Sequence, residues 1–265
     1  MTTENNAATE ITKELAKDLY EDAGQEIVKP TGKLVGLIPR AIHAALQPLE
    51  MWTMQREYNI AATKKLLEIK LAKIDPAKIS PPEPYVAVPA LQAISYCMNN
   101  EELRNMYANL LARSMTDSER DGIHPGFVEI IKQMCPDEAR IMRYFVHSNS
   151  IPTIGVRCEN AKHAGINIVH MFSDVGETMN CDYPLRIERY LNNLIRLGLL
   201  ASSEFGASYE DKSNYESCKK HPYILGIKRD YTNRLIDYPN VRITEGYTYV
   251  TELGAAFCNV CIKEQ

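Results

Sequence analysis

The sequence contains none of the short motifs that mark the common catalytic sites. It has no Gly-x-Ser-x-Gly elbow, phosphate-binding loop, dinucleotide-binding fingerprint or His-Glu-x-x-His pair. The acidic pairs at 101–102 and 137–138 stand where helices are expected to begin, and the helix dipole favours negative charge there without any catalytic role. We therefore predict that the protein is not an enzyme and binds no cofactor.

Long apolar runs are also missing. No stretch approaches the roughly 20 apolar residues that span a bilayer, and the N-terminus lacks the basic start and apolar core of a secretory signal. Seven cysteines, an odd number in a chain of 265 residues, favour free thiols in a reducing compartment over a disulfide framework. These features predict a cytoplasmic protein. The net charge of −4 does not by itself indicate nucleic-acid binding.

Closely spaced metal ligands are scarce as well. One stretch holds four potential ligands without the paired spacing of zinc sites, namely Cys158, His163, His170 and Cys181. Cys258 and Cys261 do have Cys-x-x-Cys spacing, but no second pair completes a zinc site. They also stand at the C-terminal end of an expected helix, where the dipole raises a thiol pKa. We predict no metal site and two buried cysteines in that helix.

The sequence does contain extensive helical periodicity. Residues 1–30 form an acidic segment. Within 31–80, apolar residues repeat every three or four positions from Leu49 to Ile74, which predicts a long amphipathic helix. The apolar stretch 33–52 has basic flanks, as an interfacial membrane helix would have. Residues 74–89 hold five of the 14 prolines, so we predict a boundary there with neither a helix nor a central strand.

Residues 81–135 are predicted to form a helical core region. An apolar helix from Ala90 to Met98, followed by a helix capped by Asn99 or Asn100, indicates a helical hairpin. Pro125 then opens a further helix, because proline is tolerated where helices begin. Up to Ser148 the chain is predicted to be all α.

Residues 136–265 are predicted to form an α+β domain that resembles a winged helix. Pro136 opens its first helix, strands are expected at 151–158, 199–205 and 241–250, and a second helix runs from Pro184 to Leu197. The order is helix, strand, helix, two-stranded wing and helix. Residues 206–240 are then a long insertion between the two wing strands. The predicted fold class is thus mainly α, with an N-terminal helical region followed by this domain.

Two groups of residues are candidates for binding a macromolecule. On the helix from Pro184, the apolar residues would face the core and the opposite face would carry Arg186, Arg189, Asn193 and Arg196. Arginines and an asparagine on one face suit phosphates and base edges, although an ordinary solvated or protein-binding face has the same pattern. The second group flanks Tyr223, Ile224 and Leu225 and comprises Lys219, Lys220, Lys228 and Arg229. It predicts a partner contact or a folded-back wing.

The middle of the chain resembles a known family. The segments "EPYVAVPALQAISYCMNNEELRNMYANLLARSM" and "HPGFVEIIKQMCPDEARIM" are similar to the bacterial abortive infection alpha family, most strongly from Pro82 to Tyr144. The resemblance implies a role in abortive infection, in which a phage-infected cell stops growing or dies before new phage are released. It supplies no catalytic residues.

We therefore predict an antiviral protein that acts by binding another macromolecule. Its partner would be a protein or nucleic acid, which includes molecules of phage origin, and self-association stays open. A DNA-binding regulator that uses the arginine-bearing helix is the first alternative. The second is an effector that perturbs membranes through residues 33–52.

Overall fold

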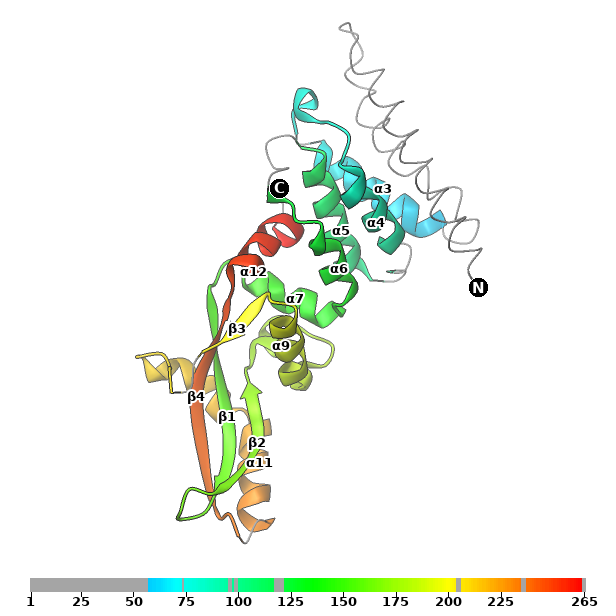
Figure 1. The fold of residues 1–265 in the computed structure, drawn as a ribbon. Helices are drawn as coiled ribbons and strands as arrows, with labels where there is room; N and C mark the ends of the chain where they lie inside the picture. The colour runs from blue at the N-terminus through cyan, green and yellow to red at the C-terminus, as the bar shows by residue number, and fades with distance from the viewer. Residues whose placement is uncertain are drawn as a thin grey trace, which may run out of the picture. The chain divides into compact units, whose positions relative to one another are not determined.

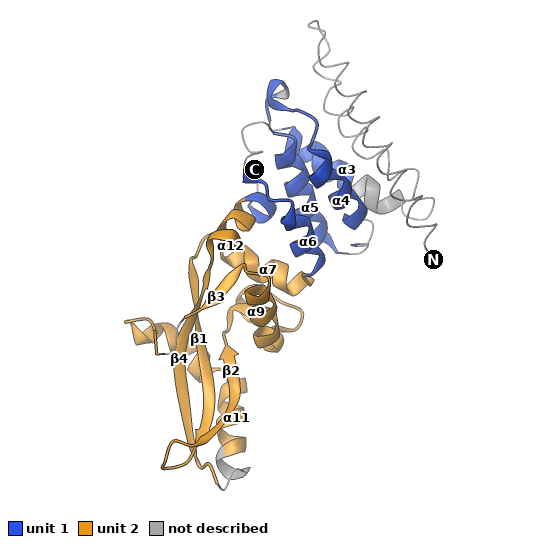
Figure 2. Ribbon diagram, viewed as in Figure 1, with its two compact units in different colours: residues 1–133, 260–265 blue, residues 134–259 orange. Residues whose placement is uncertain are grey.

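The computed structural model describes residues 57–72, 74–94, 97, 100–116, 122–203, 206–234 and 237–263. The chain divides into two compact units, one of residues 1–133 with 260–265 and one of residues 134–259 (Figure 2). The acidic segment 1–30, the membrane-contact stretch 33–52 and the first part of the long helix lie outside the described residues. Among the helices described, none is long and apolar enough to cross a membrane.

The first unit is helical around a central helix (Figure 1). Its elements are α3 (Glu57–Leu71), the 3₁₀ helix η2 (Pro76–Lys78), α4 (Pro84–Ile94), α5 (Glu101–Ser114) and α6 (Gly126–Lys132). Helix α5 contacts α3, α4 and α6, and its buried apolar side chains include Leu103, Met106, Tyr107, Leu110 and Leu111. Thr63, Leu67 and Leu71 are fully buried on α3. The described part of the predicted long helix thus buries one face, and this helix ends at Leu71, before Ile74, where the prediction placed its end.

The proline-rich stretch contradicts one prediction. Helix α4 begins at Pro84 and contains Pro89, although we expected no helix over 74–89. Pro84 stands in the first turn, where a missing N–H breaks no helical bond, and the helix tolerates the single bond lost at Pro89. The next helix follows the prediction, because the side chain of Asn100 caps α5 by accepting a hydrogen bond from Leu103 N at 2.9 Å.

The second unit is built on a four-stranded antiparallel sheet. Its strands are β1 (Ser150–Glu159), β2 (Gly165–Phe172), β3 (Leu200–Ser202) and β4 (Asn240–Val250), in the order β2-β1-β4-β3. Strands β1 and β4 pair along their length, from Ser150 opposite Tyr249 to Glu159 opposite Asn240 (Figure 1). Strand β3 pairs with β4, which confirms that the two expected wing strands are neighbours. Strand β2 was not predicted.

Several short helices accompany this sheet. They are α7 (Pro136–Tyr144), α8 (Val175–Thr178), the 3₁₀ helix η4 (Pro184–Arg186), α9 (Ile187–Arg196) and α12 (Glu252–Phe257), which continues into the π-helix η6 (Cys258–Ile262). Two of them, α9 and α12, contact the strands of the sheet. Helix α9 packs on β2, β3 and α7. It ends as predicted at Gly198, whose φ of +76° suits glycine and whose N–H reaches Ile195 O at 2.9 Å. The side chain of Thr251 caps α12 through Gly254 N at 2.9 Å.

The insertion between β3 and β4 is helical. It contains η5 (Lys212–Tyr215), α10 (Glu216–Lys220) and α11 (Pro222–Arg234), and α10 and α11 contact the sheet through β1. Ile224 is fully buried, whereas Leu225 is 49% exposed. Of the two predictions for this segment, a partner contact or a folded-back wing, its packing on the sheet through Ile224 agrees with the second. Leu225 stays exposed because helical spacing turns neighbouring residues to different sides.

Candidate macromolecule-binding face

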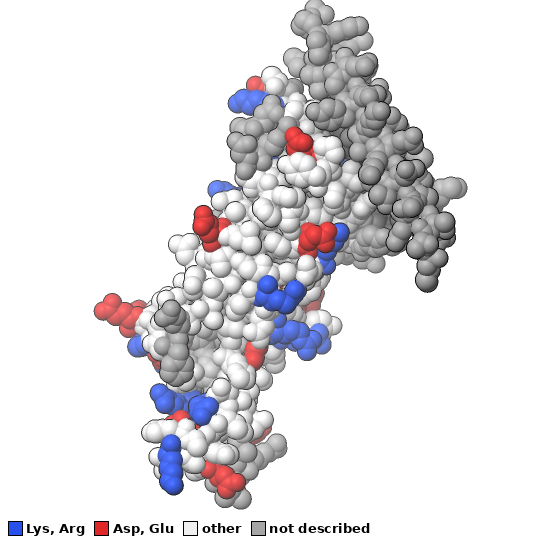
Figure 3. All heavy atoms as spheres, viewed as in Figure 1, with Lys and Arg blue, Asp and Glu red and all other residues white. Residues whose placement is uncertain are grey.

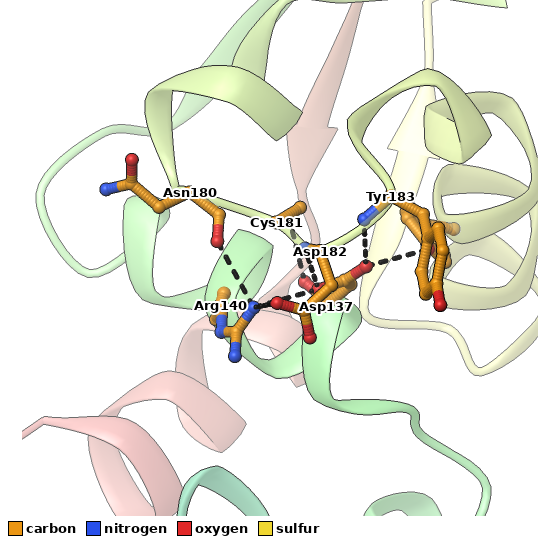
Figure 4. A network of polar contacts seen from close by, with 7 residues as sticks. Asp137, Arg140, Asn180, Cys181, Asp182 and Tyr183 are labelled. Carbon is orange, nitrogen blue, oxygen red and sulfur yellow. Dashed lines mark hydrogen bonds and ion pairs between the residues drawn. The ribbon is translucent and has the colours of Figure 1, made fainter.

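A single buried carboxylate holds the loop that leads into α9. Asp137 Oδ1 accepts hydrogen bonds from Asp182 N at 2.8 Å and from Arg140 Nη1 at 3.1 Å. Its Oδ2 accepts from Tyr183 N at 3.1 Å (Figure 4). The same oxygen accepts from the hydroxyl of Tyr190 at 2.8 Å. Burial opposes ionisation, but these bonds and the Arg140 charge outweigh it and hold the pKa of Asp137 below its usual value.

Further bonds hold the same loop from its other side. Arg140 Nη1 also lies 3.0 Å from Asp182 Oδ1 and donates to Asn180 O at 3.1 Å (Figure 4). The thiol of Cys181 donates to the main-chain oxygen of Asp137 at 3.7 Å. Residues 180–183 are therefore fixed to the first turn of α7 mainly through backbone atoms.

The neighbouring Glu138 holds the far end of the predicted binding helix. Its carboxylate is 4% exposed and accepts hydrogen bonds from Cys135 N at 2.8 Å and Asn193 Nδ2 at 2.9 Å. Asn193 Oδ1 in turn accepts from Arg196 Nε at 3.0 Å and Nη2 at 2.7 Å. Burial raises the pKa of Glu138. Two of the four residues predicted to bind a macromolecule are thus engaged with each other and with α7.

The start of α9 presents a different surface. Tyr183 is 56% exposed and Leu185 is 52% exposed, and the Arg186 guanidinium lies 4.1 Å from the centre of the Tyr183 ring. Arg189 is exposed one turn further on. Among the residues that the structure describes, no carboxylate lies within ion-pair distance of Arg186 or Arg189. Figure 3 shows Lys and Arg side chains gathered over α9 on the face drawn.

The second predicted group, the basic residues that flank positions 223–225, forms ion pairs with acidic residues. Lys219 Nζ lies 2.7 Å from Glu245 Oε1, and Lys220 Nζ lies 2.9 Å from Glu216 Oε2. Hydrogen bonds from Lys219 and Lys212 lower the pKa of Glu245, and the same contact raises that of Lys219. Arg229 pairs with Asp230 at 3.3 Å, and Lys228 is half-buried. This group is therefore largely neutralised.

The potential metal ligands are not brought together. His163 lies in the turn after β1, where its Nδ1 is 3.1 Å from Glu159 Oε1, and Cys181 is bound to α7. Over the described ranges, no group of three or more His, Cys, Asp and Glu residues is placed to hold a metal ion. Cys258 and Cys261 are both buried, as predicted, and burial raises the pKa of Cys258 to about 12.

Sequence reasoning missed the residues that organise this surface. Asp137 and Glu138 were interpreted only as first-turn acids, whereas both are buried and bound by several donors. One local signal existed, because Glu138 stands three positions after Cys135 and closes a capping box on it. No local signal links Asp137 to residues 182, 183 and 190. Tyr183 and Leu185 were not selected, since single exposed apolar residues are common.

Comparisons with known proteins find a family and a solved structure that the chain resembles. The family model described as abortive infection alpha matches residues 55–261. A solved structure of an uncharacterized protein from the hydrocarbon-degrading marine bacterium Alcanivorax borkumensis SK2 is 16% identical, with a TM-score of 0.37. That similarity covers 56% of this chain and 96% of the other, and it is too low to establish a shared fold. No curated protein matches the chain.

Proposed function

The chain belongs to the abortive infection alpha family, and from this membership we propose that it is an antiviral protein that protects bacteria from phage by abortive infection. The observation that carries the proposal is the family match, which spans most of the chain. In such a system the infected cell stops growing or dies before phage are released, so the protein protects the population and not the cell that it occupies.

We further propose that the protein acts in the cytoplasm by binding another macromolecule and not by catalysis. The buried acids of the second unit support this idea, since each oxygen of Asp137 is already occupied by donors and Glu138 is bound on both oxygens. A carboxylate saturated in this way is poorly placed to act as a general base. The exposed start of α9 supplies the contact surface instead.

A winged-helix DNA-binding regulator is the second candidate. The order of β1, β4 and β3, together with α7 and α9 packed beside them, favours it, because a winged helix has a helical face and a short antiparallel sheet. The bonds that engage Asn193 and Arg196 reduce the number of groups left for DNA. The membrane-perturbing alternative rests on residues 33–52, which lie outside the described part of the chain.

The proposal is tested by phage challenge of bacteria that express the chain. We expect fewer plaques than with an empty vector, survival of the culture at a low ratio of phage to cells, and collapse at a high ratio. Protection with survival at every ratio, or no protection against a broad phage panel, would contradict abortive infection.

The proposal that the protein is not a catalyst has a separate test. His221 and Glu177 make a contact of the kind found in catalytic pairs, with Nε2 and Oε1 3.1 Å apart. The His221 ring also has Nδ1 3.2 Å from Tyr223 N, which would fix its tautomer. We expect the double variant His221→Gln, Glu177→Gln to retain protection. Loss of protection in a variant that unfolds like the wild type would favour an enzyme.

A further inference from the structure

We propose that Tyr183, Leu185, Arg186 and Arg189, the α9 entry face, bind a protein partner through a segment in which carboxylates flank an exposed apolar side chain. This inference rests on the proposed function, because it names the surface and the partner class for a protein that acts by binding. The α9 entry face differs from the predicted set of Arg186, Arg189, Asn193 and Arg196, because Tyr183 and Leu185 take the places of Asn193 and Arg196.

The composition of the α9 entry face is that of a protein-binding hot spot. Tyr183 and Leu185 each expose about half of their surface within three positions of the chain, and Arg186 stacks on the Tyr183 ring at 4.1 Å. Tyrosine and arginine dominate hot spots because they combine large contact area with directed polar groups. Large exposed apolar residues that gather together mark interaction sites, whereas isolated ones do not.

The face is also fixed before any partner binds. The main-chain N–H of Tyr183 is bound to Asp137 Oδ2, and the preceding N–H is bound to Oδ1. Helix α9 is then held at its other end through Asn193 and Glu138. A surface that is already ordered loses less conformational entropy on binding, which raises affinity without additional contacts.

The charges of the face define the chemistry of the partner. Two acids lie close in the sequence, but Asp182 pairs with Arg140, and Glu188 Oε2 accepts a hydrogen bond from His170 N at 3.4 Å. Arg186 and Arg189 therefore remain for carboxylates from outside, which arginine binds in a bidentate manner. Next to Arg186 in the chain, Leu185 offers an exposed apolar contact. Acidic side chains around an apolar one complement this arrangement.

A nucleic acid fits the face less well. Duplex binding gains most of its free energy from several phosphate contacts, and this face supplies two arginines. The residues that would extend this pair are already engaged, because Asn193 donates to the Glu138 carboxylate and Arg196 donates to Asn193. The exposed Leu185 adds nothing to a phosphate contact. A DNA duplex is therefore used in the test as the competing ligand.

The experiment uses the full chain and a displayed library of random short peptides. Peptides selected on the wild type are sequenced, and the strongest is measured by fluorescence anisotropy against four proteins. These are the wild type, Arg186→Glu with Arg189→Glu, Tyr183→Ala, and the control Lys162→Glu with Arg242→Glu. The control reverses two exposed basic residues of the same unit, outside both candidate binding groups, and so changes the net charge as much as the arginine double variant does. Denaturant unfolding confirms that all four are folded.

We expect the selected peptides to be enriched in Asp and Glu beside aromatic or aliphatic residues. Affinity should fall at least about tenfold in the α9 variant and in Tyr183→Ala, and less than about twofold in the control. Basic peptides, no enrichment, or equal loss in the control would overturn the proposal. So would a labelled DNA duplex that binds the wild type and loses its affinity only in the α9 variant.

Phage challenge of the same variants separates this inference from the proposed function. Protection lost in the α9 variant and kept in the control supports both. Protection kept in all variants overturns the proposal that the α9 entry face binds the partner, and it leaves the antiviral function standing. A wild type that never protects contradicts the antiviral function itself.

Discussion

Helix α9 and the helical insertion of α10 and α11 each carry basic residues that looked equally suited to binding, yet they differ in what surrounds those residues. At the start of α9 the two acids nearest in sequence are directed elsewhere, to Arg140 and to His170 N. In the insertion, Glu245 comes from β4 and pairs with Lys219 and Lys212. The difference teaches that a basic run becomes a basic surface only if the fold leaves its charges unpaired.

The largest expected effect on stability comes from replacing Asp137, which holds the loop that leads into α9. Replacing Asp137 with Ala removes the acceptor of two backbone N–H groups and of the Tyr190 hydroxyl, and it leaves the Arg140 charge with one partner fewer. We expect the free energy of unfolding to fall by about 3 kcal/mol, because buried donors lose their partner. Urea denaturation measures this loss. A loss below 1 kcal/mol, of the order of a surface change, would show that the loop is held by other contacts.

The pH dependence of stability sharpens this prediction. The folded state lowers the pKa of Asp137, so its contribution is present above the ordinary value of 3.8 and is lost as pH falls through the lower folded value. The difference in unfolding free energy between wild type and Asp137→Asn should therefore shrink below pH 3.8. The contribution of Glu138 to the unfolding free energy changes with pH in the opposite direction. Because the folded state raises its pKa, this contribution is present at low pH and is lost as pH rises through the folded value. Urea titrations at several pH values measure both, and a difference that grows on acidification would contradict the assignment for Asp137.

A smaller effect is expected in the insertion. Lys219→Glu places a third carboxylate beside Glu245 and Glu216, and the lysine it replaces is only 26% exposed. We expect a loss of about 1 kcal/mol in unfolding free energy that decreases with added salt. Lys220→Glu is the matched control, since that side chain is 76% exposed and contacts one acid. Equal losses in the two variants would mean that Glu245 does not distinguish them.

The smallest effect is expected on α9. Arg189→Glu should change the unfolding free energy by less than about 0.5 kcal/mol, because Arg189 is exposed and no described carboxylate pairs with it. The measurement is the unfolding free energy of Arg189→Glu, determined by thermal or urea unfolding together with that of Lys219→Glu. If both reversals destabilised the protein equally, the contrast between a paired and an unpaired basic surface would disappear.

The parts of the fold that depend on local chemistry were predictable from sequence. Asn100 at the start of α5, Pro136 at the start of α7 and Gly198 after α9 are found where cap and stop signals indicated. Strands β3 and β4 pair as alternation suggested. Pro89 was misleading because its cost of about 3 kcal/mol inside a helix is smaller than the summed gain from burying Val86, Leu91 and Ile94, at about 1.5–3 kcal/mol each.

The parts that depend on distant partners were not predictable. Strand β2 is an edge strand whose pairing with β1 shifts register near Val156, so it has no clean alternation, and Ile166 is exposed. The neutralisation of Lys219 depends on Glu245, which lies 26 positions later (245 − 219 = 26). Asp137 acts on residues 182 and 183, which only the folded chain brings to it. A single sequence contains no signal for such pairs.

Asp137 holds its loop through backbone amides, and this determines which substitutions the loop tolerates. It binds the amides of residues 182 and 183, and every amino acid except proline supplies such an amide. These two hydrogen bonds fix the position of the loop and do not depend on which side chains residues 182 and 183 carry. The side chain at position 183 can therefore be changed to any residue except proline without loss of these two hydrogen bonds, so the surface above the loop can vary while the scaffold beneath it stays the same.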